Sequence, residues 1–141
     1  MIHGVIIKHL TLHEDERGWL AEIYRDDEDH YQPVMGYVSV THPGVARGPH
    51  EHKYQSDCFV FVGPGDFELH LWDRRENSST NGQYIKEVVG QSNPVMVLSR
   101  QVSFMAIRLL ATKMLGLLTW QTNYIAELIK PKKWTKFVGS R

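Results

Sequence analysis

The sequence predicts a single all-β domain, built as a sandwich or a barrel. Short apolar segments recur at roughly 8–12-residue spacing and are separated by turns that contain Gly and Pro. Residues 67–72 alternate apolar and polar side chains in period two, as expected of a half-buried strand. At 141 residues, the chain has the length of one domain and can bury most of its apolar surface without disulfides.

Seven segments are predicted as strands because they are short, apolar and mostly rich in β-branched or aromatic residues. In chain order they are residues 5–7, 19–24, 37–40, 58–62, 67–72, 84–89 and 95–98. The turn signals between them include His42-Pro43-Gly44 and Gly63-Pro64-Gly65. Residues 74–83 are polar and rich in turn formers, so they are expected to form a loop.

The chain changes character at about Leu98. Residues 1–98 hold 8 of the 16 Lys and Arg, 15 of the 16 Asp and Glu, and all 8 His. Residues 102–120 are apolar without a clear period of two, which leaves an amphipathic helix, a buried strand pair or a membrane span open. Arg108 and Lys113 make a span costly, and residues 130–136 form a basic end typical of a solvated tail.

The composition excludes several classes of partner. The formal net charge is zero, so nothing pulls the whole chain toward nucleic acid or a membrane surface. The single cysteine, Cys58, cannot form an internal disulfide and suits a reducing cytoplasm. It lies in an apolar segment and is predicted to be a small core residue. The first residues lack a basic start followed by a long apolar run, so no signal peptide is expected.

The densest chemistry lies in Arg47-Gly48-Pro49-His50-Glu51-His52. On a strand, His50 and His52 would point to one face and could begin a metal site, with Gln55 or Asp57 as a third ligand. Alternatively, His50 could act as a general base, with Arg47 binding a phosphate or stabilising an enolate. Spacing alone also fits two ordinary polar strand residues near the surface.

Three motifs, in order, resemble the dTDP-4-dehydrorhamnose 3,5-epimerases, which are cupin-type enzymes of deoxysugar-nucleotide synthesis. Residues 6–25 are similar to that family's opening, where an acidic residue precedes Arg-Gly-aromatic and a Glu follows. Residues 44–50 resemble its G-V-x-R-G-L-H segment, whose histidine is the catalytic base. Residues 71–84 resemble its D-L-R-x-x-S-x-T-x-G-x-W segment.

The resemblance implies a cupin-like jelly-roll fold (a double-stranded β-helix) and specific site residues. His50 would abstract a proton next to the keto group of a 4-keto-6-deoxysugar nucleotide. Arg17, Glu22, Arg47 and His52 would bind the substrate. From composition alone, the segment around Arg17 is a hairpin turn with a solvated salt bridge. No cofactor and no metal is implied, and a cytoplasmic homodimer is expected.

The chain also departs from the family pattern. Pro49 stands where the family has leucine, and the lysine of the following strand has no clear counterpart near residues 57–60. The string R-G-x-H-x-H-K is similar to that of the sugar-nucleotide 3,4-ketoisomerases, which are also cupins. A related subgroup is therefore expected rather than the 3,5-epimerase itself. The alternatives are a metal-binding cupin that uses His50 and His52, and a non-catalytic sugar-binding cupin.

After Leu98, the sequence no longer resembles the family's C-terminal half. We therefore considered a shifted reading frame, in which each codon consists of the third base of one codon and the first two bases of the next. From Leu98 onward this frame permits I-P-P-G-V-V-H-G-Y, which resembles the family's own sequence there. Constrained positions agree: Met105 followed by Ala106 forces Gly, and Phe104 followed by Met105 allows only His or Tyr. We hypothesise a cupin-like core over residues 1–98 and a divergent or frameshifted segment over residues 99–141. The family's general acid would then be lost, and the chain as written could be inactive.

Overall fold

The computed structural model describes residues 1–29, 31–52, 54–99, 104–110 and 115–122. Eleven strands and no helix are formed by these residues. The strands are β1 (Val5–His9), β2 (His13–Asp15), β3 (Gly18–Leu20), β4 (Met35–Thr41), β5 (Ala46–His50), β6 (Ser56–Phe61), β7 (Asp66–Trp72), β8 (Tyr84–Gly90), β9 (Val95–Ser99), β10 (Phe104–Leu109) and β11 (Leu115–Thr122). The prediction of an all-β, cupin-like sandwich is confirmed.

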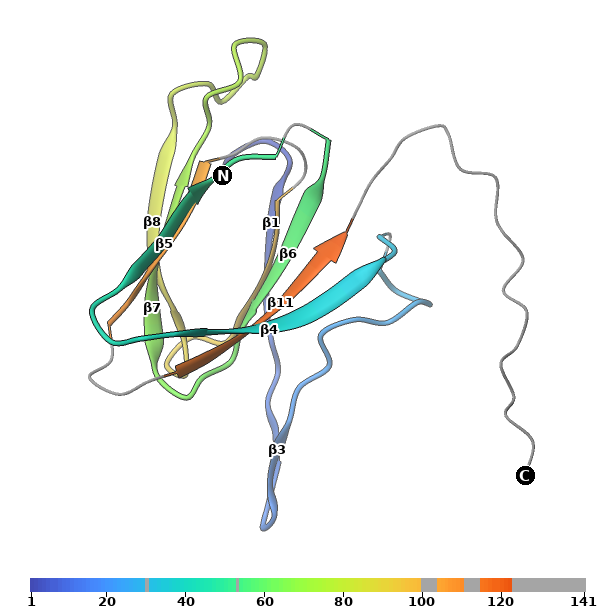
Figure 1. The fold of residues 1–141 in the computed structure, drawn as a ribbon. Helices are drawn as coiled ribbons and strands as arrows, with labels where there is room; N and C mark the ends of the chain where they lie inside the picture. Colours follow the sequence, from blue (N-terminus) through green and yellow to red (C-terminus); the bar gives the residue numbers. More distant parts are fainter. Residues whose placement is uncertain (30, 53, 100–103, 111–114, 123–141) are drawn as a thin grey trace, which may run out of the picture.

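Two antiparallel sheets face each other (Figure 1). One has five strands in the order β1-β9-β6-β11-β4, and the other has four in the order β5-β10-β7-β8. The hairpin β2–β3 projects from this body as a separate two-stranded ribbon. Apart from the consecutive pair β7 and β8, neighbouring strands in these two sheets are far apart in sequence, as in a jelly roll.

The main core lies between the sheets and follows from the period-two alternation of their strands. Phe59 and Phe61 of β6 meet Phe67, Leu69 and Leu71 of β7 there, and each is at most 7% exposed. Burying one such side chain stabilises the fold by about 1.5–3 kcal/mol. The alternate residues of β6 face outward into a second apolar cluster.

The second cluster covers the outer face of the five-stranded sheet. Cys58 and Val60 pack there with Tyr31, and Ile23 and Tyr24 lie against them. Burial raises the pKa of the Cys58 thiol to about 11, so this cysteine is an unreactive core residue as predicted.

Most predicted strands are confirmed within one or two residues, but the segment 19–24 is not one strand. Strand β3 ends at Leu20, because the following apolar side chains leave the ribbon to pack on the second cluster. Of the alternatives open for residues 102–120, the described part forms strands: β10 joins one sheet and β11 the other. Among the described residues, no helix has the length and apolar composition that a membrane crossing needs.

Candidate active site

Gly48 determines how closely β5 approaches its neighbour in the sheet. Its φ of +99° is in the left-handed region, and a Cβ there would lie 2.5 Å from the carbonyl oxygen of Met105 in β10. Any other residue would push the strands apart. Strand β5 ends two residues later, where His50 is opposite Met105. Gly48 therefore helps to determine where His50 lies in the sheet.

His50 lines a small pocket between the two sheets. The other lining residues are His52, Gln55, Asp57, Phe59, Ser99 and Met105. The pocket thus gathers two imidazoles and a carboxylate from distant parts of the fold.

The two histidines reach the pocket by different routes. His50 is the last residue of β5, whereas His52 lies beyond the strand. The arrangement considered for a metal site, with both histidines on one strand, is therefore not formed, although both line the same pocket. His52 lies in the segment between β5 and β6, beside Asp57.

One of the residues that line this pocket is a buried carboxylate. Asp57 begins the inward-facing series that continues with Phe59 and Phe61, and its side chain is 10% exposed. Gln55 Nε2 donates a hydrogen bond of 2.6 Å to Asp57 Oδ1. His52 Nε2 lies 3.2 Å from Asp57 Oδ2.

Sequence reasoning considered Gln55 and Asp57 only as possible metal ligands. The signal that was missed is the charge of Asp57. It stands at an inward-facing position of a strand whose other inward-facing residues are apolar. In the described part of the chain, no group of three or more His, Cys, Asp and Glu side chains is arranged to hold a metal ion.

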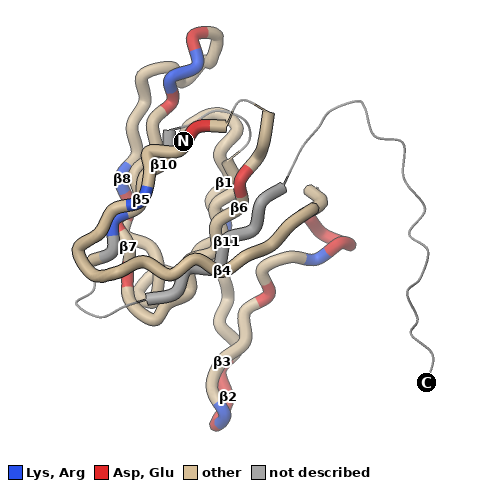
Figure 2. Tube along the Cα trace, in the orientation of Figure 1, with Lys and Arg blue, Asp and Glu red and all other residues tan. Residues whose placement is uncertain are grey.

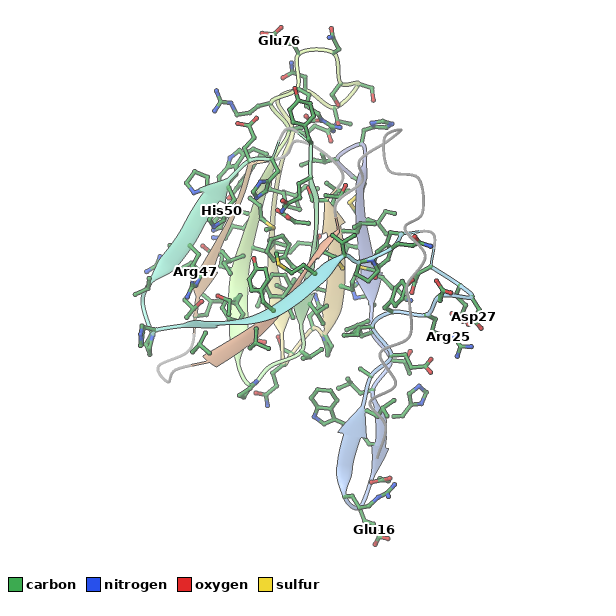
Figure 3. All side chains as sticks on the ribbon, turned by 45° about the vertical axis from the view of Figure 1, so that its right-hand side comes forward. Glu16, Arg25, Asp27, Arg47, His50 and Glu76 are labelled. Carbon is green, nitrogen blue, oxygen red and sulfur yellow. The ribbon has the colours of Figure 1, made fainter. Side chains whose placement is uncertain are left out.

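The other three predicted site residues, Arg47, Arg17 and Glu22, do not line this pocket. The Arg47 guanidinium donates to Thr41 Oγ1 at 2.7 Å and to the Val40 carbonyl oxygen, which ties it to the end of β4 (Figure 3). Arg17 is paired with Asp15 at 2.5 Å in the turn of the β2–β3 hairpin. This is the salt-bridged turn that composition suggested.

Glu22 lies in the loop after the hairpin, 3.4 Å from Arg25. Charged residues gather on the hairpin and on this loop, away from the body of the sheets (Figure 2). Figure 3 shows Glu16 at the tip of the hairpin, which projects away from the body of the sheets that carries His50. One copy alone therefore cannot bring Arg17 to His50.

A family model described as dTDP-4-dehydrorhamnose 3,5-epimerase matches residues 1–103. The chain belongs to this family. It is 38% identical over 99 residues to the probable low-salt glycan biosynthesis epimerase Agl13 of Haloferax volcanii, covering 68% of this chain and 63% of that protein. It is also 38% identical over 101 residues to the spore coat polysaccharide biosynthesis protein SpsL of Bacillus subtilis, covering 70% and 65%. The chain thus spans less than two thirds of each of these relatives.

Among solved structures, the fold resembles the dTDP-6-deoxy-D-glucose-3,5-epimerase RmlC of Legionella pneumophila in complex with dTDP-4-keto-L-rhamnose. The TM-score is 0.76 at 22% identity, over 89% of this chain and 70% of that one. At this identity the likeness concerns the fold. The family predicted from the three motifs is confirmed by the family match.

Proposed function

We propose that the protein epimerises or isomerises a nucleotide-linked 4-keto-6-deoxysugar, with His50 as the base. The observation that carries this is that His50 lines one pocket together with a second imidazole, that of His52. A neutral imidazole is a suitable base near pH 7 for a proton next to a carbonyl. The proton moves to His50, the C–H electron pair becomes that of an enolate, and a second group returns a proton to carbon.

The substrate class is supported by the family and by the relatives' names. The Legionella pneumophila relative holds dTDP-4-keto-L-rhamnose. The Haloferax and Bacillus relatives are named for glycan and polysaccharide synthesis. In this proposal Arg47, Arg17, Glu22 and His52 bind the nucleotide sugar.

Arg17 and Glu22 can take this role only from a second copy of the chain, given their distance from the pocket within one copy. The exposed edge of the five-stranded sheet supports such a homodimer. Strand β4 is the last strand of that sheet, and large apolar side chains are exposed along and beside it. They include Val34, Met35 and Val38, which are 62%, 52% and 64% exposed. An apolar, unpaired edge strand is usually covered by a partner.

We also propose that residues from about Ser99 onward are read out of the family's frame. The family match ends at residue 103, and the loss of acids and histidines after residue 98 agrees with a shift. Resequencing the gene across codons 95–105 tests this. An open frame that encodes this same C-terminal sequence in several close relatives would show that it is a genuine divergent end.

Proton exchange tests the assignment of His50. The protein is incubated with a dTDP-linked 4-keto-6-deoxysugar in deuterated water, and deuterium at the carbon next to the keto group is followed by mass spectrometry and NMR. We expect His50→Ala to slow incorporation by about 10²–10⁴-fold, the contribution usual for a general base.

His9→Ala is the matched control, because His9 is an exposed histidine on β1 that contacts Asn93. Its incorporation should equal that of the wild type. Exchange that is present in the wild type and unchanged in His50→Ala would exclude His50 as the base. A wild type that binds the sugar nucleotide without exchange would indicate a binding module.

A further inference from the structure

Asp57 is a carboxylate whose two oxygens each meet one polar partner inside the pocket. Oδ1 accepts a 2.6 Å hydrogen bond from Gln55, and Oδ2 faces the Nε2 of His52 at 3.2 Å. The residue as a whole is 7% exposed, whereas the side chain of His52 is 39% exposed. A buried carboxylate therefore supports an imidazole that solvent or a ligand can still reach.

The fold gives no reason for an acid at this position. The next inward residues of β6 are Phe59 and Phe61, which build the core, and an apolar residue at position 57 would continue the series. Burying a carboxylate costs free energy unless its oxygens are paired. In the described part of the chain, the partners of this carboxylate are an amide and an imidazole, not a Lys or Arg. The pairing of this buried carboxylate therefore depends on Gln55 and His52.

We propose that Asp57, fixed by Gln55, is a positioning residue that makes His52 the proton donor of the reaction. This inference rests on the proposed function of His50. The carboxylate holds the proton on the Nε2 that faces it, so a proton bound at Nδ1 is the one that can be given away. His50 removes the substrate proton to give the enolate, and His52 delivers its Nδ1 proton to carbon. After product release, His50 loses a proton to water and His52 regains one.

Both proton carriers then precede residue 99. The general acid that the family resemblance places after Leu98 would not be required, because the second imidazole occupies the same pocket as the first.

Two rates separate the roles of the histidines. Loss of a donor leaves abstraction by His50 intact, so deuterium still enters recovered substrate while product formation stops. In His52→Gln and Asp57→Asn we expect epimer or isomer formation at saturating substrate to fall by about 10–100-fold. Incorporation of deuterium into recovered substrate should stay within about threefold of wild type. A purely structural role would lower both rates together, and that result would overturn the proposal.

The matched control is Asp29→Asn. The side chain of Asp29 is 11% exposed and its carboxylate pairs with Lys8 at 3.5 Å, outside the pocket. This variant removes a charge that is buried to the same degree as that of Asp57. Product formation and deuterium incorporation should both remain at the wild-type rate. If Asp57→Asn fails to fold, Gln55→Ala is the second variant. Gln55 is partly exposed, and its loss removes the hydrogen bond that holds the Asp57 carboxylate. Product formation should fall, while deuterium incorporation should not.

A second measurement does not depend on the reaction. At a pH where His52 is neutral, its ¹⁵N NMR signals, assigned by their loss in His52→Gln, should show a single tautomer with the proton on Nε2 in the wild type. In Asp57→Asn they should show mixed tautomers. Unchanged signals would refute the positioning role. If the wild type shows no exchange with the sugar nucleotide, the proposed function fails, while these signals still decide whether Asp57 sets the state of His52.

Discussion

The strands up to Ser99 and the two strands that follow contribute differently to the molecule. Among the residues that the structure describes, every polar side chain that lines the pocket lies at or before Ser99, and β10 adds Met105. Yet β10 runs between β5 and β7, and β11 runs between β6 and β4, so both lie inside their sheets. The first region thus supplies the polar groups of the pocket, and the second completes the backbone pairing of both layers.

The difference reflects what each task asks of a sequence. A strand inside a sheet needs backbone N–H and C=O groups and side chains that tolerate burial, and many apolar sequences satisfy this. A proton-transfer site needs particular groups within hydrogen-bond reach of the reacting atoms. An apolar stretch read in an altered frame can therefore still pair as strands, whereas a catalytic residue would be lost. This is why intact sheets are compatible with the proposed frameshift.

Ending the chain at Ser99 should have the largest effect on this comparison. Without β10 and β11, β5 loses its partner and β4 loses its link to β6. We expect no cooperative thermal transition and no near-ultraviolet circular dichroism, because inner strands hold both sheets together. A truncated chain that melts cooperatively would show instead that the strands up to Ser99 fold without the two that follow.

The sequence predicted the strands of the first region well where alternation was clear. Residues 67–72, 84–89 and 95–98 match β7, β8 and β9 closely. Strand β5 was not among the predicted strands, because Arg47, Gly48 and Pro49 have little intrinsic β-propensity. Its pairing with β10 forms it, and that contact is 55 residues away between Met105 and His50. No local pattern could reveal it.

The site was predicted in part for the same reason. The string around His50 and His52 marked the pocket, and the family motifs gave the first histidine its proposed role. The contact between His52 and Asp57 joins a residue beyond the end of β5 to a residue of β6. Spacing suggested Gln55 and Asp57 only as metal ligands, because a hydrogen bond between them is invisible in the sequence.

Gly48→Ala tests the junction between the two regions. The added Cβ would lie 2.5 Å from the Met105 carbonyl oxygen, at a φ that L side chains rarely adopt. We expect a loss of about 3–4 kcal/mol in the free energy of unfolding, from strain and from separation of the strands. Urea unfolding measures it. Gly44→Ala is the control, because its φ of +73° is also left-handed but nothing lies within 4 Å. Equal losses in both variants would mean that β5 and β10 do not approach this closely.

Asp73→Asn tests a stabilising contact that lies wholly in the first region. The buried Asp73 carboxylate pairs with Arg75 at 2.8 Å and accepts hydrogen bonds from Ser78 and Thr80. Arg75 foremost, and then the two hydroxyls, hold the pKa of this carboxyl well below its usual range. Breaking such a buried pair should cost about 3 kcal/mol at pH 7.

The effect of Asp73 should depend on pH with a definite sign. Because its pKa is lower in the folded chain, its contribution is present above the unfolded pKa of about 4 and is lost as pH falls toward the folded value. Unfolding free energies of wild type and Asp73→Asn should therefore converge below about pH 4. A difference that stays constant down to pH 2 would show that the charge of Asp73 is not what stabilises the loop.

Arg17→Ala should have the smallest effect and tests whether the hairpin serves a second copy. Arg17 is 86% exposed in its side chain and its partner Asp15 lies on the same turn, so the fold should lose almost nothing. If the guanidinium binds the nucleotide sugar, KM should rise by about tenfold with little change in melting temperature. Mixing this variant with His50→Ala separates the two geometries. When Arg17 acts on the partner's pocket, a mixed dimer contains one site with both residues intact, and activity at low substrate recovers toward wild type. When Arg17 acts within its own copy, every site lacks one of the two, and mixing gains nothing.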